Sequence, residues 1–128
     1  MAEGGIDILS LGFDAAAAIT QYAAVKLSTA DAVTPVTAEG DLVLGVAQFA
    51  VSAGEITKGK GSSVRVAGIS LMKVGTGGVT VGNIVVSDSA GLAVASNSGA
   101  RPLGVCLATG SAGDLVPVLL TPGLPLVP

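Results

Sequence analysis

Two stretches of this sequence are nearly the same: residues 44–55 read LGVAQFAVSAGE and residues 103–114 read LGVCLATGSAGD. Both begin with Leu-Gly-Val and end with Ser-Ala-Gly followed by an acidic residue, at the same spacing. Repetition of a whole phrase within a short chain is typical of an internally duplicated fold.

The similarity extends on both sides of the repeated phrase. When the chain is aligned with itself at one fixed offset, Val25 falls on Ile84 and Val33 on Leu92 without a gap. A short insertion at 58–62 then restores the register, so that Val64 falls on Val116. Each half is therefore predicted to be a strand, a turn, a strand beginning Leu-Gly-Val, a loop and a closing strand; the alternative is coincidence among common small residues.

Short strands are the dominant local pattern. Seven segments rich in Val, Leu and Ile alternate with turns rich in Gly, Ser and Asp, and they span 24–27, 42–47, 63–69, 79–81, 83–86, 103–107 and 115–120. The one plausible helix is at 14–18, where Asp14 could cap a run of alanines, but this run is too short to be stable alone. The predicted fold class is all-β: a small barrel or sandwich of short strands, built from two similar halves that close a barrel together, with extended N- and C-terminal arms.

The composition predicts a protein whose surface is covered by other subunits. Only 12% of the 128 residues are charged and 2% are aromatic, while 50% are hydrophobic. A chain of this length forms one domain, and Val, Leu, Ile and Ala stabilise its core less than aromatic residues would. Burial between subunits is the natural supplement, so we expect an oligomer.

Charge and hydropathy exclude several partners. The net charge is −3 and the six basic residues are scattered, so we expect no nucleic-acid binding. No apolar run approaches the roughly 18 residues that a membrane span needs, and Glu3 and Asp7 stand where a secretory leader would be basic, so we expect a soluble, unsecreted chain. The one cysteine, Cys106, aligns with Ala47 and is expected to be a small buried residue.

Catalytic and metal sites are not expected. The sequence has no histidine and one cysteine, which removes the usual general base, the Cys-His pair and a zinc site. Four aspartates lack the spacing of a calcium loop and are interpreted as turn formers: Asp31, Asp41, Asp88 and Asp114. No cofactor is predicted.

Two weaker interpretations concern lysines. Residues 54–61 follow the phosphate-loop pattern as far as Gly59-Lys60, but Gly61 replaces the Ser or Thr and a strand pattern follows, so we interpret the segment as an exposed basic loop. A carrier domain with a modified lysine is a further alternative, although neither Asp-Lys-Ala nor Met-Lys-Met surrounds Lys26, Lys58 or Lys60.

A set of strand and turn phrases together carries a family resemblance. In chain order they are ITQYAAVKL from Ile19, LGVA from Leu44, VRVAGI from Val64, GVTVGN from Gly78, SDSAG from Ser87, RPLGVCL from Arg101 and AGDLVPV from Ala112. In this order the phrases, from Ile19 to Leu120, resemble the capsid cement, or head decoration, proteins of tailed bacteriophages. One departure is Gly82-Asn83, where the family phrase has Gly-Asp.

The resemblance implies a structural role. It implies a homotrimer, made in the host cytoplasm, that binds the major capsid protein on the outer capsid surface of the virion at threefold and quasi-threefold positions and stabilises the shell. It implies no enzymatic activity. The alternatives are another phage β-module, from a tail or baseplate, or, less favoured, a lipoyl-like carrier or ligand-binding domain.

The ends of the chain are the predicted contact segments. The expected division is 1–18 as an N-terminal arm or first strand, 19–120 as the β-barrel domain and 121–128 as a Pro-rich C-terminal arm. In the first segment an apolar, partly alternating stretch could add to a capsid subunit as a strand or be an ordinary first strand of the barrel. The candidate contact residues are Ile6, Ile8, Leu9, Leu11, Phe13, Leu124, Leu126 and Val127.

Overall fold

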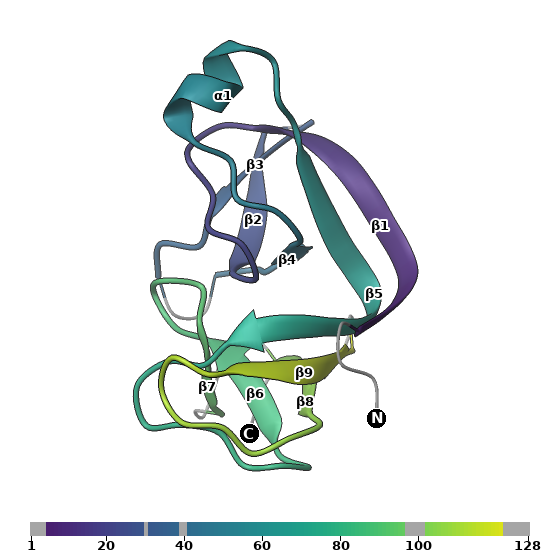
Figure 1. Cartoon of the computed structure of the whole chain (residues 1–128), viewed down its shortest axis with the longest axis vertical. Coiled ribbons are helices and arrows are strands. Elements are labelled where there is room, and N and C mark those ends of the chain that lie inside the picture. The colour runs from purple at the N-terminus through teal and green to yellow at the C-terminus, as the bar shows by residue number, and fades with distance from the viewer. Residues whose placement is uncertain (1–4, 30, 39–40, 97–101, 122–128) are drawn as a thin grey trace.

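The computed structural model describes residues 5–29, 31–38, 41–96 and 102–121, with residues 5–8 described for their backbone alone. Strands are the main regular structure in this part of the chain, and they form a single sheet with the order β1-β3-β2-β4-β5-β9-β8-β6-β7 (Figure 1). The elements are β1 (Gly5–Ala15), β2 (Ala24–Thr29), β3 (Ala32–Pro35), β4 (Gly45–Ala47), α1 (Ala53–Thr57), β5 (Ser62–Lys73), β6 (Ile84–Ser87), β7 (Ala93–Ala95), β8 (Pro102–Cys106) and β9 (Leu115–Leu120). The prediction of an all-β fold is confirmed.

The first half of the chain closes a five-stranded barrel. Its strands follow the order β1-β3-β2-β4-β5, and an additional pairing between β1 and β5 completes the ring. β1 runs antiparallel to β5 from Gly5 to Phe13, then parallel to β3 at Asp14 and Ala15. The barrel occupies the upper part of Figure 1, and β1 is one of its strands.

The second half repeats this arrangement below the first. β5, β9, β8, β6 and β7 follow one another in the sheet, and a parallel bridge from Val74 to Ala93 brings the last strand back to the end of β5. The two halves were expected to close one barrel together. Each instead forms its own ring, because the short strands curl tightly enough to cover their own apolar face.

Strand β5 belongs to both rings. At Val64 and Arg65 it pairs with β4, and from Gly68 onward the same edge pairs with β9. Gly68, the first residue of the second stretch, has a φ of 107°, a conformation that favours glycine, and the strand changes direction near it (Figure 1).

Equivalent buried residues fill the two rings. The first core cluster consists of Ala15, Ile19, Val25, Val33, Ala47, Val51 and Val64. Six of these have a structural equivalent in the second cluster, namely Val74, Val79, Val85, Ala93, Cys106 and Val118. Cys106 takes the place of Ala47 and both are fully buried, as the sequence predicted.

Backbone hydrogen bonds show the duplication most directly. Tyr22 donates its N–H to the Ala47 carbonyl at 2.8 Å, and Gly82 donates to the Cys106 carbonyl at 2.7 Å. Both donors have positive φ, 62° for Tyr22 and 84° for Gly82. In the loops that follow, Ser52 and Ser111 each donate the backbone N–H to the acidic side chain three residues later.

The repeated Leu-Gly-Val phrase has a steric reason. A Cβ at Gly45 would collide with the Arg65 carbonyl on β5, and one at Gly104 would collide with the Leu119 carbonyl on β9. The closing strand of each ring therefore passes too close to this position for any other residue. The two glycines permit the close approach.

The register of the repeat differs from the fixed offset. Val25 faces Gly45, and Val85, not Ile84, faces Gly104. Val74 is the equivalent of Ala15, and the segment from Val74 to β6 has one residue more than the segment from Ala15 to β2, which shifts β6 by one position. In the closing strand the structural equivalent of Val64 is Val118 rather than Val116, because Val64 pairs with Ala47 and Val118 pairs with Cys106.

The segment 14–18, considered as a plausible but short helix, does not form one. Asp14 and Ala15 are the last residues of β1, and the Ala16 N–H donates to the Val33 carbonyl at 2.8 Å. The helix α1 lies instead in the segment interpreted as a basic loop. Ser52 and Glu55 form a reciprocal capping box there, which the shorter Asp114 side chain does not reproduce in the second half.

Six of the seven expected strands overlap observed strands, although β4 covers only the second half of 42–47, and the remaining segment, 79–81, contributes an isolated bridge at Val79. β3 and β7 were not among the expected strands. They are four and three residues long, both contain alanine and β3 ends in proline, so neither has a distinct strand pattern.

Replacing either repeated glycine should destabilise the fold severely. Gly45→Ala and Gly104→Ala force a side chain against backbone, and we expect each to lower the free energy of unfolding by about 3 kcal/mol. Gly12→Ala, in the exposed part of β1, meets nothing within 4 Å and serves as the control. Denaturant unfolding measures all three; equal midpoints for Gly104→Ala and Gly12→Ala would contradict the steric argument.

Candidate interaction surface

The described residues contain no group of three or more His, Cys, Asp or Glu that could hold a metal ion. A cavity of about 470 Å³ opens beside the loop before β6, and its lining consists of glycine, small polar and aliphatic residues without an ionisable side chain. It offers neither a nucleophile–base pair nor a charged ligand set. No helix in the described ranges is long and apolar enough to cross a membrane.

The N-terminal candidate residues lie together on β1. Leu9 and Leu11 are 46% and 41% exposed, whereas Phe13 is partly buried against the core of the first ring. Ile6 faces Ile69 of β5 in the backbone register, and the side chains of Ile6 and Ile8 are outside the described part. The structure thus makes this segment a strand of the barrel and leaves two of its leucines on the surface.

The C-terminal candidate residues are Leu124, Leu126 and Val127, and all three lie outside the described residues. The described chain ends at Thr121, whose N–H donates to the Leu103 carbonyl at 3.1 Å. The prediction that 121–128 is an arm stays a prediction.

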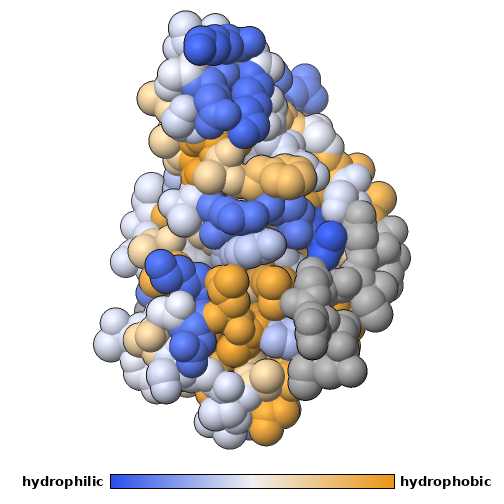
Figure 2. Space-filling view, viewed as in Figure 1, coloured by the Kyte–Doolittle hydropathy of each residue, from blue (hydrophilic) through white to orange (hydrophobic). Residues whose placement is uncertain are grey.

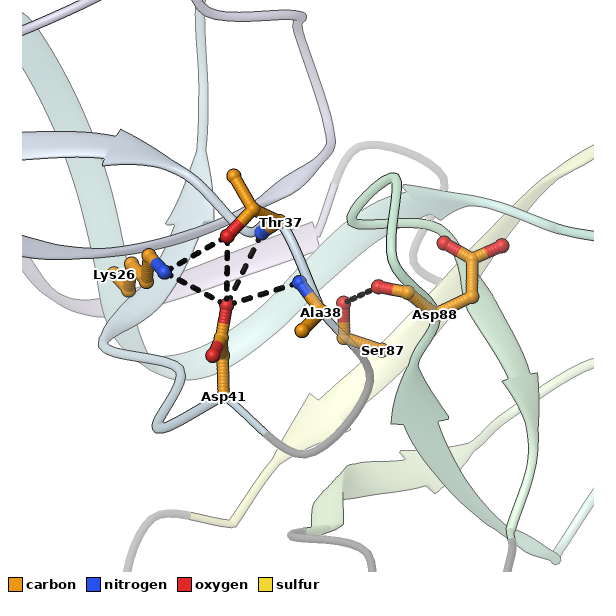
Figure 3. Close-up of polar contacts among 6 residues, drawn as sticks. All are labelled: Lys26, Thr37, Ala38, Asp41, Ser87 and Asp88. Carbon is orange, nitrogen blue, oxygen red and sulfur yellow. Dashed lines mark hydrogen bonds and ion pairs between the residues drawn. The ribbon is translucent and has the colours of Figure 1, made fainter.

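A charged group anchors the loop between β3 and β4. One oxygen of the Asp41 carboxylate accepts from the Lys26 ammonium at 2.8 Å and from the backbone N–H groups of Thr37 and Ala38, each at 3.1 Å (Figure 3). These bonds, that with Lys26 foremost, lower the pKa of Asp41 from 3.8 to about 2. Asp41 is thus a turn former, as predicted, and Lys26 is fixed against the barrel.

The capping residue of α1 forms a second charged group. Glu55 accepts from Lys60 at 2.9 Å and from the backbone N–H of Ser52 at 3.0 Å. The bond with Lys60 is the largest cause that lowers the pKa of Glu55 to about 2. Since Lys60 also donates to the Ala50 carbonyl, its ammonium closes the helix loop rather than facing a phosphate.

A more extensive apolar surface lies on the second ring, and sequence reasoning did not select it. Figure 2 shows hydrophobic side chains gathered over the region where β5 and β9 lie side by side. We call the outer face the six apolar residues that share this outward surface in the strand register: Ile69, Leu71, Ile84, Val105, Leu115 and Leu119. A usable signal was the unbroken apolar run of 115–120, which is typical of a strand covered on both faces.

The Lys26–Asp41 pair should make the free energy of unfolding depend on pH in the acidic range. Because the pKa of Asp41 is lower in the folded state, the pair contributes stability above about pH 4, and this contribution is lost as the pH falls toward 2. Asp41→Asn should therefore lower the melting temperature at pH 7 and flatten its fall between pH 4 and 2. Thermal unfolding across this range measures both effects. Asp31→Asn, which also removes one negative charge, is the control, and an unchanged Asp41→Asn profile would contradict the assignment.

Comparisons with known proteins found a match in structure alone. No protein-family model and no curated protein sequence matches this chain. Among solved structures, the chain is similar to the N base of the head fiber gp8.5 in bacteriophage phi29, with a TM-score of 0.69. The similarity covers 88% of this chain and 93% of that one at 19% sequence identity. At this identity the comparison establishes a shared fold.

Proposed function

We propose that this chain is a structural protein of a bacteriophage virion, which binds the outer surface of the head as a cement or decoration protein and acts without catalysis. The observation that carries the proposal is the similarity in fold to the base of a phage head fiber, which extends over nearly the whole of both chains. The family resemblance of the strand and turn phrases supports the same assignment independently.

The chemistry of the described surface supports a binding role over an enzymatic one. The cavity beside β6 has no ionisable lining residue, and Lys26 and Lys60 are held by carboxylates. Uncharged apolar side chains are instead exposed on β1 and on the outer face. Exposed apolar patches of this kind are typical of protein–protein contact. A head protein is favoured over a tail or baseplate module because the matched structure belongs to a head fiber.

Stabilisation of the shell would follow from the thermodynamic linkage between binding and assembly. A protein that binds the assembled shell and not its free subunits stabilises the shell by RT ln(1 + [L]/Kd), about 4 kcal/mol per site at a thousandfold excess over Kd. A homotrimer at threefold and quasi-threefold positions adds multivalency, because the second and third contacts form at high effective concentration. Each subunit then needs only a small area of contact with the major capsid protein.

The candidate shell contacts are the exposed leucines of β1 and the C-terminal segment. Leu9 and Leu11 project from a strand that β5 already holds in place, so binding through them costs little ordering of the backbone. Leu124, Leu126 and Val127 would add apolar contacts from the other end of the chain.

The test is binding to heads that lack the protein. Purified chain should co-sediment with emptied, undecorated heads of the phage that encodes it and should raise the temperature at which those heads rupture. Leu9→Lys together with Leu11→Lys should weaken binding at least tenfold, because each ammonium would have to be desolvated in the contact. Leu42→Lys, which alters an exposed leucine of the β3–β4 loop, is the control. Absence of both co-sedimentation and thermal protection would refute the proposed function.

A further inference from the structure

The two rings have equivalent rows of outward residues. Val25, Ala47 and Val64 point into the first core, and Val85, Cys106 and Val118 point into the second. Because side chains alternate along a strand, a neighbour of each of these residues points outward. In the first ring the outward row is Ala24, Val46 and Arg65, each facing the next on the neighbouring strand. In the second ring the equivalent row is Ile84, Val105 and Leu119.

In the first ring this row is covered by the rest of the chain. Ala24 and Val46 are fully buried, although neither belongs to the core of its own ring. Both pack instead in the cluster that contains Met72, Leu103 and Leu120 of the second ring. The Ala24 N–H also donates to the Gly91 carbonyl at 2.9 Å, so the second ring lies directly on this row.

In the second ring the same row is larger and uncovered. Ile84 replaces Ala24 and is 38% exposed, and Leu119 replaces Arg65 and is 39% exposed. The row continues across β5 through Ile69, which faces Leu119. Leu115, at 51% exposure, extends the surface along β9. The exposed Lys73 faces Leu115 at one end of this surface, and the six residues of the outer face beside it are uncharged.

From this asymmetry we infer that the outer face binds a second copy of this chain. Within one chain the equivalent row is covered by a ring of the same architecture, so a ring from another copy is the partner that its geometry suits. The larger side chains at Ile84 and Leu119 provide the apolar area that association between separate molecules requires. The inference identifies a surface for the proposed self-association and does not depend on attachment to a shell.

Charged substitutions on the outer face test the inference. Light scattering of the wild type at tens of micromolar should give a multiple of 12.2 kDa, three times that value for the proposed trimer. Ile84→Lys and Leu119→Lys should each raise the dissociation constant at least a hundredfold and give a mass of 12.2 kDa, with an unchanged circular dichroism spectrum. Leu42→Lys, at a leucine that is 69% exposed on the first half, should keep the wild-type mass.

Milder and truncated variants distinguish the other occupants. If a lysine variant fails to fold, Leu115→Gln combined with Leu119→Gln should still dissociate the assembly. A chain that ends at Thr121 should keep the wild-type number of subunits. If this truncation alone gives single chains, residues 122–128 occupy the face and the inference is wrong. It is equally wrong if the wild type is a single chain, if the outer-face variants keep its mass, or if they lose shell binding while keeping that mass.

Discussion

The closing strand of each ring passes so close to the Leu-Gly-Val strand that no side chain fits at its glycine. At Gly45 the obstacle is the Arg65 carbonyl, and at Gly104 it is the Leu119 carbonyl. Glycine in a strand normally weakens a sheet, because it adds conformational entropy to the unfolded chain and packs no side chain. Its use at both positions shows that tight curvature, rather than strand propensity, limits this fold. Rings of such short strands can close only where two backbones meet without a Cβ between them.

The tight rings explain the composition. Each encloses a small interior that aliphatic side chains, Met72 and Cys106 fill, and Phe13 packs against the first of these cores while remaining only partly buried. Small interiors bury little apolar area, so neither ring has the core of an ordinary domain. The chain compensates by sharing β5 between the rings and by packing the outward Ala24 and Val46 of one ring against the other. The low aromatic content was interpreted from the sequence as a sign of oligomerisation. The small interiors of the two rings already favour such a composition within one chain.

The sequence predicted the duplication, the all-β class and the burial of Cys106, because these depend on matching residues that lie inside the rings. It did not predict the register of β6, because an alignment without gaps cannot account for the one residue added in the preceding loop. In a strand, a slip of one residue exchanges the two faces. The ungapped alignment matches Ile84 with the buried Val25 and so assigns Ile84 to the core, although its side chain points outward. The apolar surface on β1 was found from the sequence, whereas the outer face required the correct register.

Differences between the two rings therefore say more about function than their similarities do. Inward positions carry similar small residues in both rings because the enclosed space is small, as Ala47 and Cys106 show. Outward positions face no such constraint, and there the rings differ, with Arg65 in one and Leu119 in the other. The Arg65 side chain donates to the Ile69 carbonyl at 2.8 Å and so satisfies a polar group within its own chain. Leu119 has no polar atom to satisfy, so its contribution at this surface depends on what covers it, and a partner that brings apolar atoms gains the most from it.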